Sequence, residues 1–480
     1  MSVQGTYQPD RTQRIENRDC DLLLAAGTVL TVDDERQVVD NGSVAVIADR
    51  IVGVGPAHEF EGWTAGRVID CRDSAIIPGL VDCHNHLFQA LARGLGEGLS
   101  IWPWLCEFMW PYSIAMTAED ARVAATLGAI EAVRAGTTCV IDNHYAPTDQ
   151  ATTLAVADAI QSVGLRGSVV RGIVGRKSQV AAQRGLPDAL FRYSAEEEIE
   201  ITGLCMERRP PGSFVSIWPA PLNLSYVDQD LVRASVELSR NFGARWHTHC
   251  SEGQKDPASY LEAYGIRPVE WLQREGLLDE NATLAHAIWL DDSEVASVGA
   301  AGASAAHNPT SNAYLASGYM RLPELHAAGA VIGLGTDGPS CGHRQDLFEC
   351  MKQAIFVQRL RTLEPTSVRC EDALEMATRE GAKLADIDAG VLAEGKLADI
   401  VVVGLDRPHL QPLHRAVSTL VYSARGSDVD FTIIGGQVVF EKGRCVLIDE
   451  AAVMIEAQRR AEELVERAGF GALCEAWSNR

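Results

Sequence analysis

The feature that most constrains the fold is a long alternation of strand-like and helix-like segments in the middle of the chain. Short apolar runs recur between helical patterns, at residues 138–142, 167–171, 214–218, 245–249, 282–286, 303–307 and 331–337. Alternation over about 300 residues favours parallel strands joined by helices. We therefore expect an α/β fold with a (β/α)₈ TIM barrel over residues 77–391. A doubly wound open sheet would alternate too, but no glycine-rich phosphate loop follows the first central strand.

The sequence pattern at the two ends of the chain differs from that of this central region. Short β-rich runs broken by Gly, Asn and Asp fill residues 20–76, and similar runs return in residues 392–447. The simplest assembly is a composite β-sandwich, built from both chain ends and packed against the barrel. Residues 1–19 are polar and are expected to be a flexible lead-in. Residues 448–480 are expected to carry a C-terminal helix that stops at Gly469.

The formal net charge of −23 excludes some classes of partner. A surface this acidic repels the phosphates of nucleic acids and of anionic membranes, so we expect neither as a partner. No charged segment followed by an apolar one opens the chain, and no apolar stretch reaches the about 18 residues that a membrane span needs. The 12 cysteines include no Cys-x-x-Cys pair, which indicates reduced thiols and a cytoplasmic protein.

Four short segments place metal-ligating residue types at the ends of predicted strands. They carry His84 and His86 in PGLVDCHNH, His249 in WHTHCSE, His286 in LAHA and Asp337 in GLGTDG. Residues two apart on a strand point to the same face, and barrel enzymes place their chemistry at C-terminal strand ends. One divalent ion is therefore expected, Zn²⁺ first and Fe²⁺ as the alternative, with a water in its open position. Its expected ligands are His84, His86, His249 and Asp337.

Other sequence features narrow the kind of metal site. The rival zinc arrangement, His-x-Glu with a downstream Pro-Cys-x-x-Cys, is absent from the sequence. A bridged pair of ions would need a shared ligand such as a carbamylated lysine, and residues 214–221 contain no lysine, so one ion is expected. His247 is either a core residue or a neighbour that orients a ligand. His249 is preferred as the ligand because it lies nearer the strand end.

At these residues the chain resembles the amidohydrolase superfamily. The motifs that carry the resemblance are PGLVDCHNHLFQALARG, HTHCSE, LAHAIWL, AAHNPTSNAYLASG, GLGTDGPS and GVLAEGKLADIVVV. The chain is most similar to the branch that holds atrazine chlorohydrolase, s-triazine hydrolase and deaminases of guanine, 8-oxoguanine, pterin and S-adenosylhomocysteine. The resemblance covers residues 21–448. It implies the same four metal ligands and a barrel with a strand-rich second domain.

The resemblance also implies roles for residues that do not bind the metal. Glu252 becomes the proton shuttle, and His286 becomes the residue that polarises the hydroxide or the substrate. Gln89 matches a glutamine that hydrogen-bonds a ring heteroatom, although a solvent-facing residue at a helix start would explain it equally well. Trp104 matches a tryptophan that lines the pocket. His144 lies near the expected barrel mouth and is either a substrate contact or an ordinary loop histidine.

Two segments depart from the relatives' pattern and limit the choice of substrate. Deaminases of S-adenosylhomocysteine usually carry a histidine in an Ala-Pro-His-Ala-Pro segment, where residues 218–223 here read WPAPLN, so that activity is disfavoured. Residues 339–343, PSCGH, replace a run of small residues and asparagine. The loop after Asp337 is therefore expected to have a different shape.

The expected function is a metal-dependent hydrolytic deaminase of an amino-substituted N-heterocycle, such as an s-triazine, a guanine-type or 8-oxoguanine-type purine, or a pterin. The ion would lower the pKa of its water, Glu252 would carry the proton to a ring nitrogen, and Asp337 would relay the remaining proton to ammonia. The alternatives are release of chloride or an alkylamine, opening of a cyclic amide, and a barrel kept as a non-catalytic partner. Relatives commonly form dimers or larger assemblies, so a homo-oligomer is expected.

Overall fold

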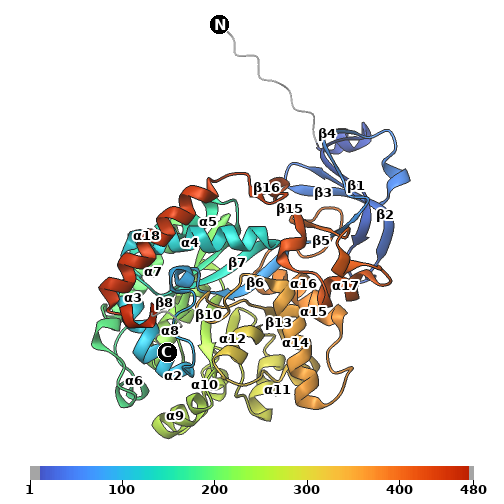
Figure 1. Cartoon of the computed structure of the whole chain (residues 1–480). Coiled ribbons are helices and arrows are strands. Elements are labelled where there is room, and N and C mark those ends of the chain that lie inside the picture. Colours follow the sequence, from blue (N-terminus) through green and yellow to red (C-terminus); the bar gives the residue numbers. More distant parts are fainter. Residues whose placement is uncertain (1–10, 475–480) are drawn as a thin grey trace.

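The computed structural model describes residues 11–474, and its centre consists of parallel strands with helices outside them (Figure 1). One four-stranded sheet has the order β6-β7-β8-β9 and another the order β10-β11-β12-β13. These strands are β6 (Leu80–Asn85), β7 (Thr137–His144), β8 (Arg166–Ile173), β9 (Val215–Pro221), β10 (Trp246–Cys250), β11 (Ala282–His286), β12 (Ser304–His307) and β13 (Val331–Leu334). Every neighbouring pair is parallel, which confirms the expected α/β class.

Hydrogen bonds also connect the outer strands of these two sheets. At one edge the backbone nitrogen of His249 donates to the carbonyl of Leu222, 3.2 Å away, just beyond β9. At the other edge the backbone nitrogen of Asp337 donates to the carbonyl of His84 over 3.0 Å. Both links lie at C-terminal strand ends, so they bring three of the expected metal ligands to the same end of the sheets.

Helices follow the strands, and polar residues cap several of them. Thr117 begins α4 and forms a capping box with Asp120, and Ser194 does the same for α7 with Glu197. The principal connecting helices are α4 (Ala118–Arg134), α5 (Gln150–Ser162), α7 (Ala195–Arg208), α8 (Gln229–Phe242), α10 (Pro268–Arg274), α11 (Asp292–Ala300), α13 (Leu322–Ala328) and α14 (Leu347–Thr362). Further helices are α2 (Ile101–Pro103), α3 (Trp110–Ala115), α6 (Gln179–Gln183), α9 (Lys255–Tyr264), α12 (Pro309–Tyr314), α15 (Cys370–Ala377), α16 (Arg379–Leu384) and α17 (Ala416–Tyr422).

Strands from both chain ends share one hydrogen-bonded sheet, as expected for a composite β unit. Its order is β17-β16-β15-β14-β5-β1-β2-β3, with β4 paired to β1. The strands are β1 (Asp19–Leu30), β2 (Val38–Ile47), β3 (Arg50–Pro56), β4 (Thr64–Asp70), β5 (Ser74–Pro78), β14 (Ile400–Gly404), β15 (Val429–Ile434), β16 (Gln437–Glu441) and β17 (Arg444–Cys445). The sequence predicts a sandwich here, and its strands form one continuous hydrogen-bonded sheet of nine strands. The sheet is continuous because β14 from the C-terminal part pairs directly with β5 from the N-terminal part.

The terminal segments agree only in part with expectation. Residues 1–10 of the predicted lead-in lie outside the described residues, and Arg11–Glu16 form helix α1. Arg14 of α1 pairs with Asp19 and Asp21 at the start of β1, and these ion pairs hold the helix in place. The predicted C-terminal helix is α18 (Glu450–Ala468), and it ends at Gly469 as expected, with a φ of 74°.

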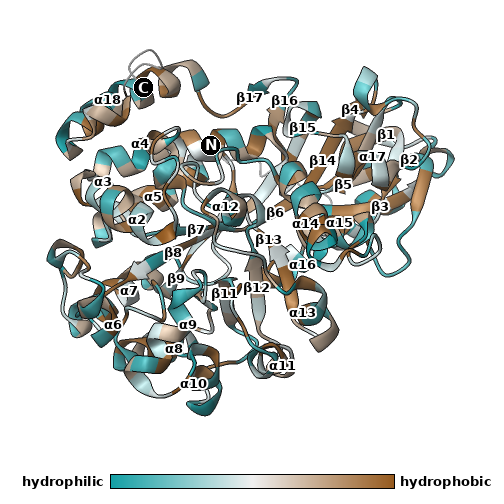
Figure 2. Ribbon diagram, turned by 60° about the horizontal axis from the view of Figure 1, so that its bottom comes forward, coloured by the Kyte–Doolittle hydropathy of each residue, from teal (hydrophilic) through white to brown (hydrophobic). Residues whose placement is uncertain are grey.

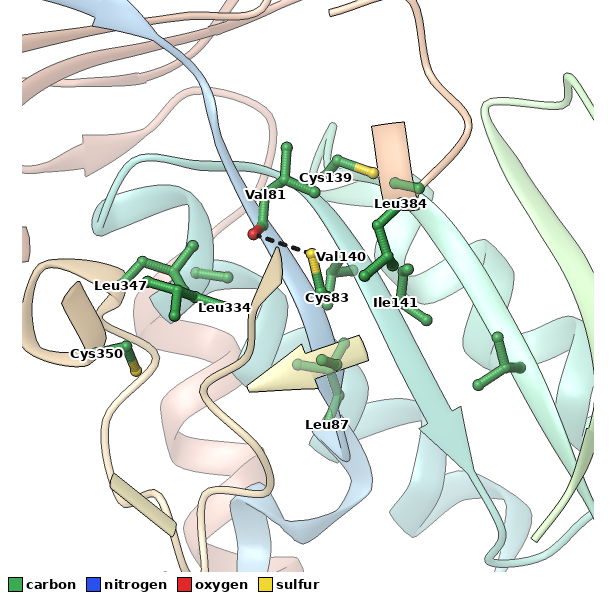
Figure 3. Packing of buried hydrophobic residues seen from close by; sticks show 14 of the residues in the cluster. Val81, Cys83, Leu87, Cys139, Val140, Ile141, Leu334, Leu347, Cys350 and Leu384 are labelled. Carbon is green, nitrogen blue, oxygen red and sulfur yellow. Dashed lines mark hydrogen bonds between the residues drawn. The ribbon is translucent and has the colours of Figure 1, made fainter. Parts of the chain in front are cut away.

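Apolar side chains fill the space around the inner strands. Figure 3 shows Cys83 of β6 packed among Val81, Val140 and Leu384, so this cysteine is a core residue. Gly333 of β13 allows the close approach, because a Cβ there would lie 2.2 Å from the sulfur of Cys83. Figure 2 shows hydrophilic residues on outer helices such as α9 and α10. None of the helices within residues 11–474 is long and apolar enough to cross a bilayer.

Asp399 ties the composite sheet to β8, and we expect its loss to destabilise the protein. Its buried carboxylate accepts hydrogen bonds from the backbone nitrogen of Gly435 at 2.7 Å and from Arg166 Nε at 3.1 Å. Asp399→Ala leaves the guanidinium of Arg166 without its partner, so the free energy of unfolding should fall by about 2–4 kcal/mol in urea denaturation. The exposed pair of Glu119 and Arg122 is the control, and Glu119→Ala should cost about 0.5 kcal/mol or less. Equal losses in the two variants would contradict this prediction.

Candidate active site

The four predicted metal ligands meet in one buried space between β6, β10 and the loop after β13. Asp337 Oδ1 lies 3.6 Å from His84 Nε2 and 3.4 Å from His86 Nε2. The Nε2 atoms of His86 and His249 are 3.2 Å apart. Tetrahedral ligands at typical Zn–N distances lie about 3.4 Å from one another, so these spacings fit such an ion. Within residues 11–474, the buried Nε2 of His84 has no hydrogen-bond partner, which is what a metal ligand atom requires.

Hydrogen bonds to the other ring nitrogen aim these histidines at the common space. The Nδ1 of His86 donates to the carbonyl of Asn143 at 2.6 Å, and that of His249 donates to the carbonyl of Leu222 at 2.7 Å. Each bond leaves the lone pair on Nε2, where a metal would bind. Burial lowers the pKa of all three histidines, together with repulsion from neighbouring imidazoles, so the rings are neutral at physiological pH.

His247 lies behind the metal-ligand cluster. Its Nε2 is 2.9 Å from the Nδ1 of His84, and its ring stacks on that of His84 with a centroid distance of 5.0 Å. Residues 247 and 249 lie on the same face of β10, but only His249 reaches the cluster. The structure therefore favours the second of the two interpretations of His247, a neighbour that orients a ligand.

Glu252 and His286 lie beside the metal-ligand cluster. The Nε2 of His286 is 3.7 Å from Glu252 Oε2 and 3.6 Å from Asp337 Oδ2. Its Nδ1 donates to Asn312 Oδ1 at 2.9 Å, which fixes the ring. Burial raises the pKa of Glu252 to about 7. Burial alone would lower the pKa of His286, but the carboxylates of Glu252 and Asp337 raise it overall. The carboxyl of Glu252 can therefore gain or lose a proton near neutral pH, and the carboxylates around His286 favour its charged form.

The backbone holds two of these residues in a conformation that L-residues rarely adopt. His286 has a φ of 67° and Asp337 a φ of 60°, both in the left-handed region. Each such residue costs of the order of 1 kcal/mol, and the cost is tolerated where the surrounding contacts fix the chain. The bond from the Asp337 nitrogen to the carbonyl of His84 is one of those contacts.

A small cavity opens beside the cluster. Its volume is about 30 Å³, which is room for roughly one water molecule. Its lining includes His86, Gln89, Ile101, Trp104, Leu105, Tyr145, Leu222, Asn223, Tyr226, His249, Glu252, His286, Leu315, Asp337 and Cys341. Ile101 and Leu315 also line a larger cavity of about 630 Å³, open to solvent. These two side chains therefore separate the site from an outer vestibule.

The predicted substrate contacts lie at different distances from this cavity. Gln89 and Trp104 are buried and line it, so Gln89 does not face solvent. Ser340 Oγ donates to Gln89 Oε1 at 2.5 Å, and Gln89 Nε2 donates to the hydroxyl of Tyr145 at 3.2 Å. His144 is not part of the lining: it is buried, and its Nε2 donates to the carbonyl of Pro147 at 2.7 Å. The alternation of a strand turns His144 away and presents Tyr145 to the cavity instead.

Sequence reasoning missed the buried carboxylates behind the ligands. Asp82 accepts hydrogen bonds from Thr336 Oγ1 at 2.5 Å and from Asn85 Nδ2 at 2.7 Å, and so joins β6 to the loop that carries Asp337. Asp142 accepts from the backbone nitrogen of Leu87 at 2.8 Å. Burial raises the pKa of Asp82 to about 6 and that of Asp142 to about 7. The two-residue spacing between Asp82 and His84 could have indicated the first of them.

Comparison with known proteins covers nearly the whole chain. Residues 75–439 match the amidohydrolase family. A 5-methylthioadenosine/S-adenosylhomocysteine deaminase of Pelotomaculum thermopropionicum is 32% identical over 451 residues, which cover 93% of this chain and 99% of that protein. A 5′-deoxyadenosine deaminase of Methanosarcina mazei is 32% identical over 447 residues, again covering 93% and 99%.

Solved structures show the same overall arrangement. An adenosine deaminase from Xanthomonas campestris with bound zinc has a TM-score of 0.87 at 26% identity, over 93% of this chain and 99% of that one. Atrazine chlorohydrolase from Arthrobacter aurescens, complexed with zinc, has a TM-score of 0.84 at 23% identity and covers 92% and 100%, which shows a common fold. The resemblance inferred from the sequence motifs is thus confirmed, and the chain belongs to the amidohydrolase family.

Proposed function

We propose that this chain is a hydrolytic deaminase of an adenine nucleoside. The observation that carries the proposal is the position of Glu252 and His286, two proton-transfer groups that lie directly beside a metal-ligand cluster. Metal-dependent deamination of an amino-substituted heterocycle is the activity expected from the sequence, and the deaminases aligned over 93% of the chain agree with it.

The donor set suits one divalent ion, and we propose zinc. His84, His86, His249 and Asp337 would hold it, because neutral imidazoles and a carboxylate are the ligands that zinc prefers. Two structurally similar proteins were solved with zinc, which supports zinc over iron. When bound, the ion supplies Lewis acidity and lowers the pKa of a water toward neutrality.

The protein's own groups then move the protons of the reaction. Glu252 accepts one proton from the attacking water and delivers it to a ring nitrogen next to the carbon that carries the amine. Protonated His286 donates a hydrogen bond from Nε2 to the attacking oxygen and stabilises its charge. Asp337 Oδ2 lies 3.6 Å from the Nε2 of His286 and so faces the same oxygen. It can take the second proton of that oxygen and pass it to the departing amine. Water and amine thus become a ring carbonyl and ammonia.

We also infer that the two parallel sheets close into the (β/α)₈ barrel. The hydrogen bonds between His249 and Leu222 and between Asp337 and His84 support closure at both edges. A closed barrel would explain why ligands far apart in sequence meet at one end, since the active sites of such barrels lie at the C-terminal ends of their strands.

The proposed substrate is a nucleoside rather than a bare ring. The inner cavity holds only a water-sized space, so a purine would enter by displacing Ile101 and Leu315, and its sugar would lie in the outer vestibule. Gln89 would hydrogen-bond the ring. Relatives named for deamination of 5′-deoxyadenosine and 5-methylthioadenosine support this choice over triazines, guanines and pterins. Leu222 and Asn223 line the cavity in the segment that lacks the relatives' histidine, so S-adenosylhomocysteine is expected to react more slowly.

The deaminase activity is tested with purified zinc-loaded protein. Ammonia release should be measured with adenosine, 5′-deoxyadenosine, 5-methylthioadenosine, S-adenosylhomocysteine, guanine and an amino-triazine. We expect release from at least one adenine nucleoside and a loss of about 10²–10⁴-fold in kcat for Glu252→Gln, since the amide cannot move a proton. Release from the triazine or guanine alone would contradict the nucleoside proposal. Release of chloride or an alkylamine without ammonia would indicate the alternative leaving groups.

The activity should depend on pH through Glu252. Burial raises the pKa of its carboxyl to about 7, and the group must be ionised to accept a proton from water. The value of kcat/KM should therefore rise with pH and level off above an apparent pKa of at most about 7, because a bound cation favours the ionised form. A profile from pH ~5 to ~9 with the best substrate measures this. Activity that is constant down to pH ~5 would show that Glu252 does not control the step.

The ligand assignment predicts a graded loss of metal. His249→Ala removes a direct ligand and should leave less than about a tenth of a zinc per chain by elemental analysis after dialysis. His247→Ala removes the contact to His84 and should weaken zinc binding by about 10–100-fold in chelator competition. His343→Ala is the control, since His343 lies outside the cluster and should keep full occupancy. Equal affinity of the His247 variant and the parent would contradict its orienting role.

A further inference from the structure

One wall of the inner cavity is a short segment formed by α2 and the π-helix η3 (Trp104–Met109). Ile101, Trp104 and Leu105 of this segment line the cavity. Because the cavity has room for only about one water, small displacements of this wall change both the fit of a substrate and its entry. The groups that hold the wall from behind therefore affect the site without touching it.

A row of aromatic rings supports this wall from behind. The ring of Trp104 lies 5.8 Å from that of Phe108, at an interplanar angle of 71°. Phe108 lies 5.6 Å from Phe470, and Phe470 stacks on Tyr112 at 6.4 Å with an angle of 12°. Such edge-to-face and stacked pairs stabilise the packing beyond the effect of their buried area. The row leads from the cavity wall to Phe470, which lies just beyond the end of α18.

The backbone at Gly96 also contacts this row of rings. A Cβ at Gly96 would lie 2.5 Å from Phe108 Cδ1 and 3.0 Å from Trp104 Nε1, so the loop at this glycine presses directly on both rings. Phe108 therefore cannot move toward Gly96. Phe470 and Tyr112 also pack against Phe108, at centroid distances of 5.6 Å and 5.8 Å, so removing the ring of Phe470 would take away one of the contacts that hold Phe108.

The C-terminal helix holds Phe470 in this position. Figure 1 shows α18 lying along α4 and α3. The Nε of Arg467 donates to the carbonyl of Ala115 at 3.1 Å, and Arg467 and Arg460 both pair with the buried carboxylate of Asp120. Gly469 has a φ of 74°, which ends the helix and turns the chain. Phe470 then packs against Phe108 and Tyr112.

We propose that Phe470 is a positioning residue for the active site: its ring braces Phe108 and Trp104 and so fixes the Ile101–Met109 wall. The kinetic part of this inference rests on the proposed function. Loss of the ring would loosen a wall that contacts substrate and transition state alike, so KM would rise while kcat stays close to that of the parent enzyme. The C-terminal helix would thereby contribute to substrate fit from outside the cavity.

The bracing is tested without any substrate by amide hydrogen exchange of the zinc-loaded protein. Phe470→Leu should speed exchange in residues 101–115 at least about fivefold, and Phe470→Tyr, which keeps the ring, should stay within about twofold of the parent. Leu464→Val is the matched control, because this buried residue anchors α18 but is not part of the aromatic row. The inference is overturned if Phe470→Leu leaves residues 101–115 unchanged, or if Leu464→Val accelerates them equally.

Steady-state kinetics test the consequence for the site. Phe470→Leu should raise KM for the best adenine nucleoside about fivefold or more and change kcat by less than about twofold, with Phe470→Tyr close to the parent. In a double-mutant cycle, Phe470→Leu should add little to the KM of Phe108→Leu, since both act through one row of rings. A fall in kcat alone, or additive effects in the cycle, would overturn the positioning role. If the parent deaminates no nucleoside, the proposed function fails, and the exchange experiment still decides the bracing.

Discussion

Three imidazole nitrogens and one carboxylate oxygen share a buried space that is largely closed to water. Asp337 Oδ1 lies 3.6 Å from His84 Nε2 and 3.4 Å from His86 Nε2, and the Nε2 atoms of His86 and His249 are 3.2 Å apart. These distances are close to those between neighbouring ligands of a tetrahedral zinc ion. Such a cluster is costly without a cation, because buried polar atoms need partners. Many features of the chain around it follow from holding these atoms in place. The carbonyls of Asn143 and Leu222 fix two rings, and the backbone bond from Asp337 to His84 fixes the carboxylate.

The same buried environment shifts the pKa values of the two groups that are proposed to move protons. Glu252 has a pKa near 7 because it is removed from water, whereas the carboxylates around His286 favour its charged form. Behind them, Asp82 links β6 to the loop that carries Asp337 through Thr336. Metal-dependent deamination needs both a ligand set and a proton shuttle, and here one desolvated region provides the two. An exposed glutamate, with a pKa of about 4.3, would be almost fully ionised at neutral pH, and its carboxylate would be a weaker base toward a proton of water.

The outer parts of the chain define the shape of the region around this centre. The nine-stranded sheet joins both chain ends, and Asp399 connects it to β8 through Arg166. The C-terminal helix reaches the cavity wall through Phe470 and Phe108. In the proposed function the reacting groups lie at or just after the C-terminal ends of the parallel strands, whereas the fit of a substrate would depend on loops and on a distant helix.

The sequence by itself determined the α/β class and the contribution of both chain ends to one β unit. It also predicted four metal ligands, because strand-end positions and two-residue spacing are local properties, and the family resemblance added Glu252 and His286 to the candidate centre. It could not place His144 and Tyr145, since one residue of register decides which side chain faces the cavity. It also could not show the hydrogen bond from Thr336 to Asp82 or the contact of Phe470 with Phe108. Those pairings join segments hundreds of residues apart, and only the tertiary structure brings them within hydrogen-bond or van der Waals distance.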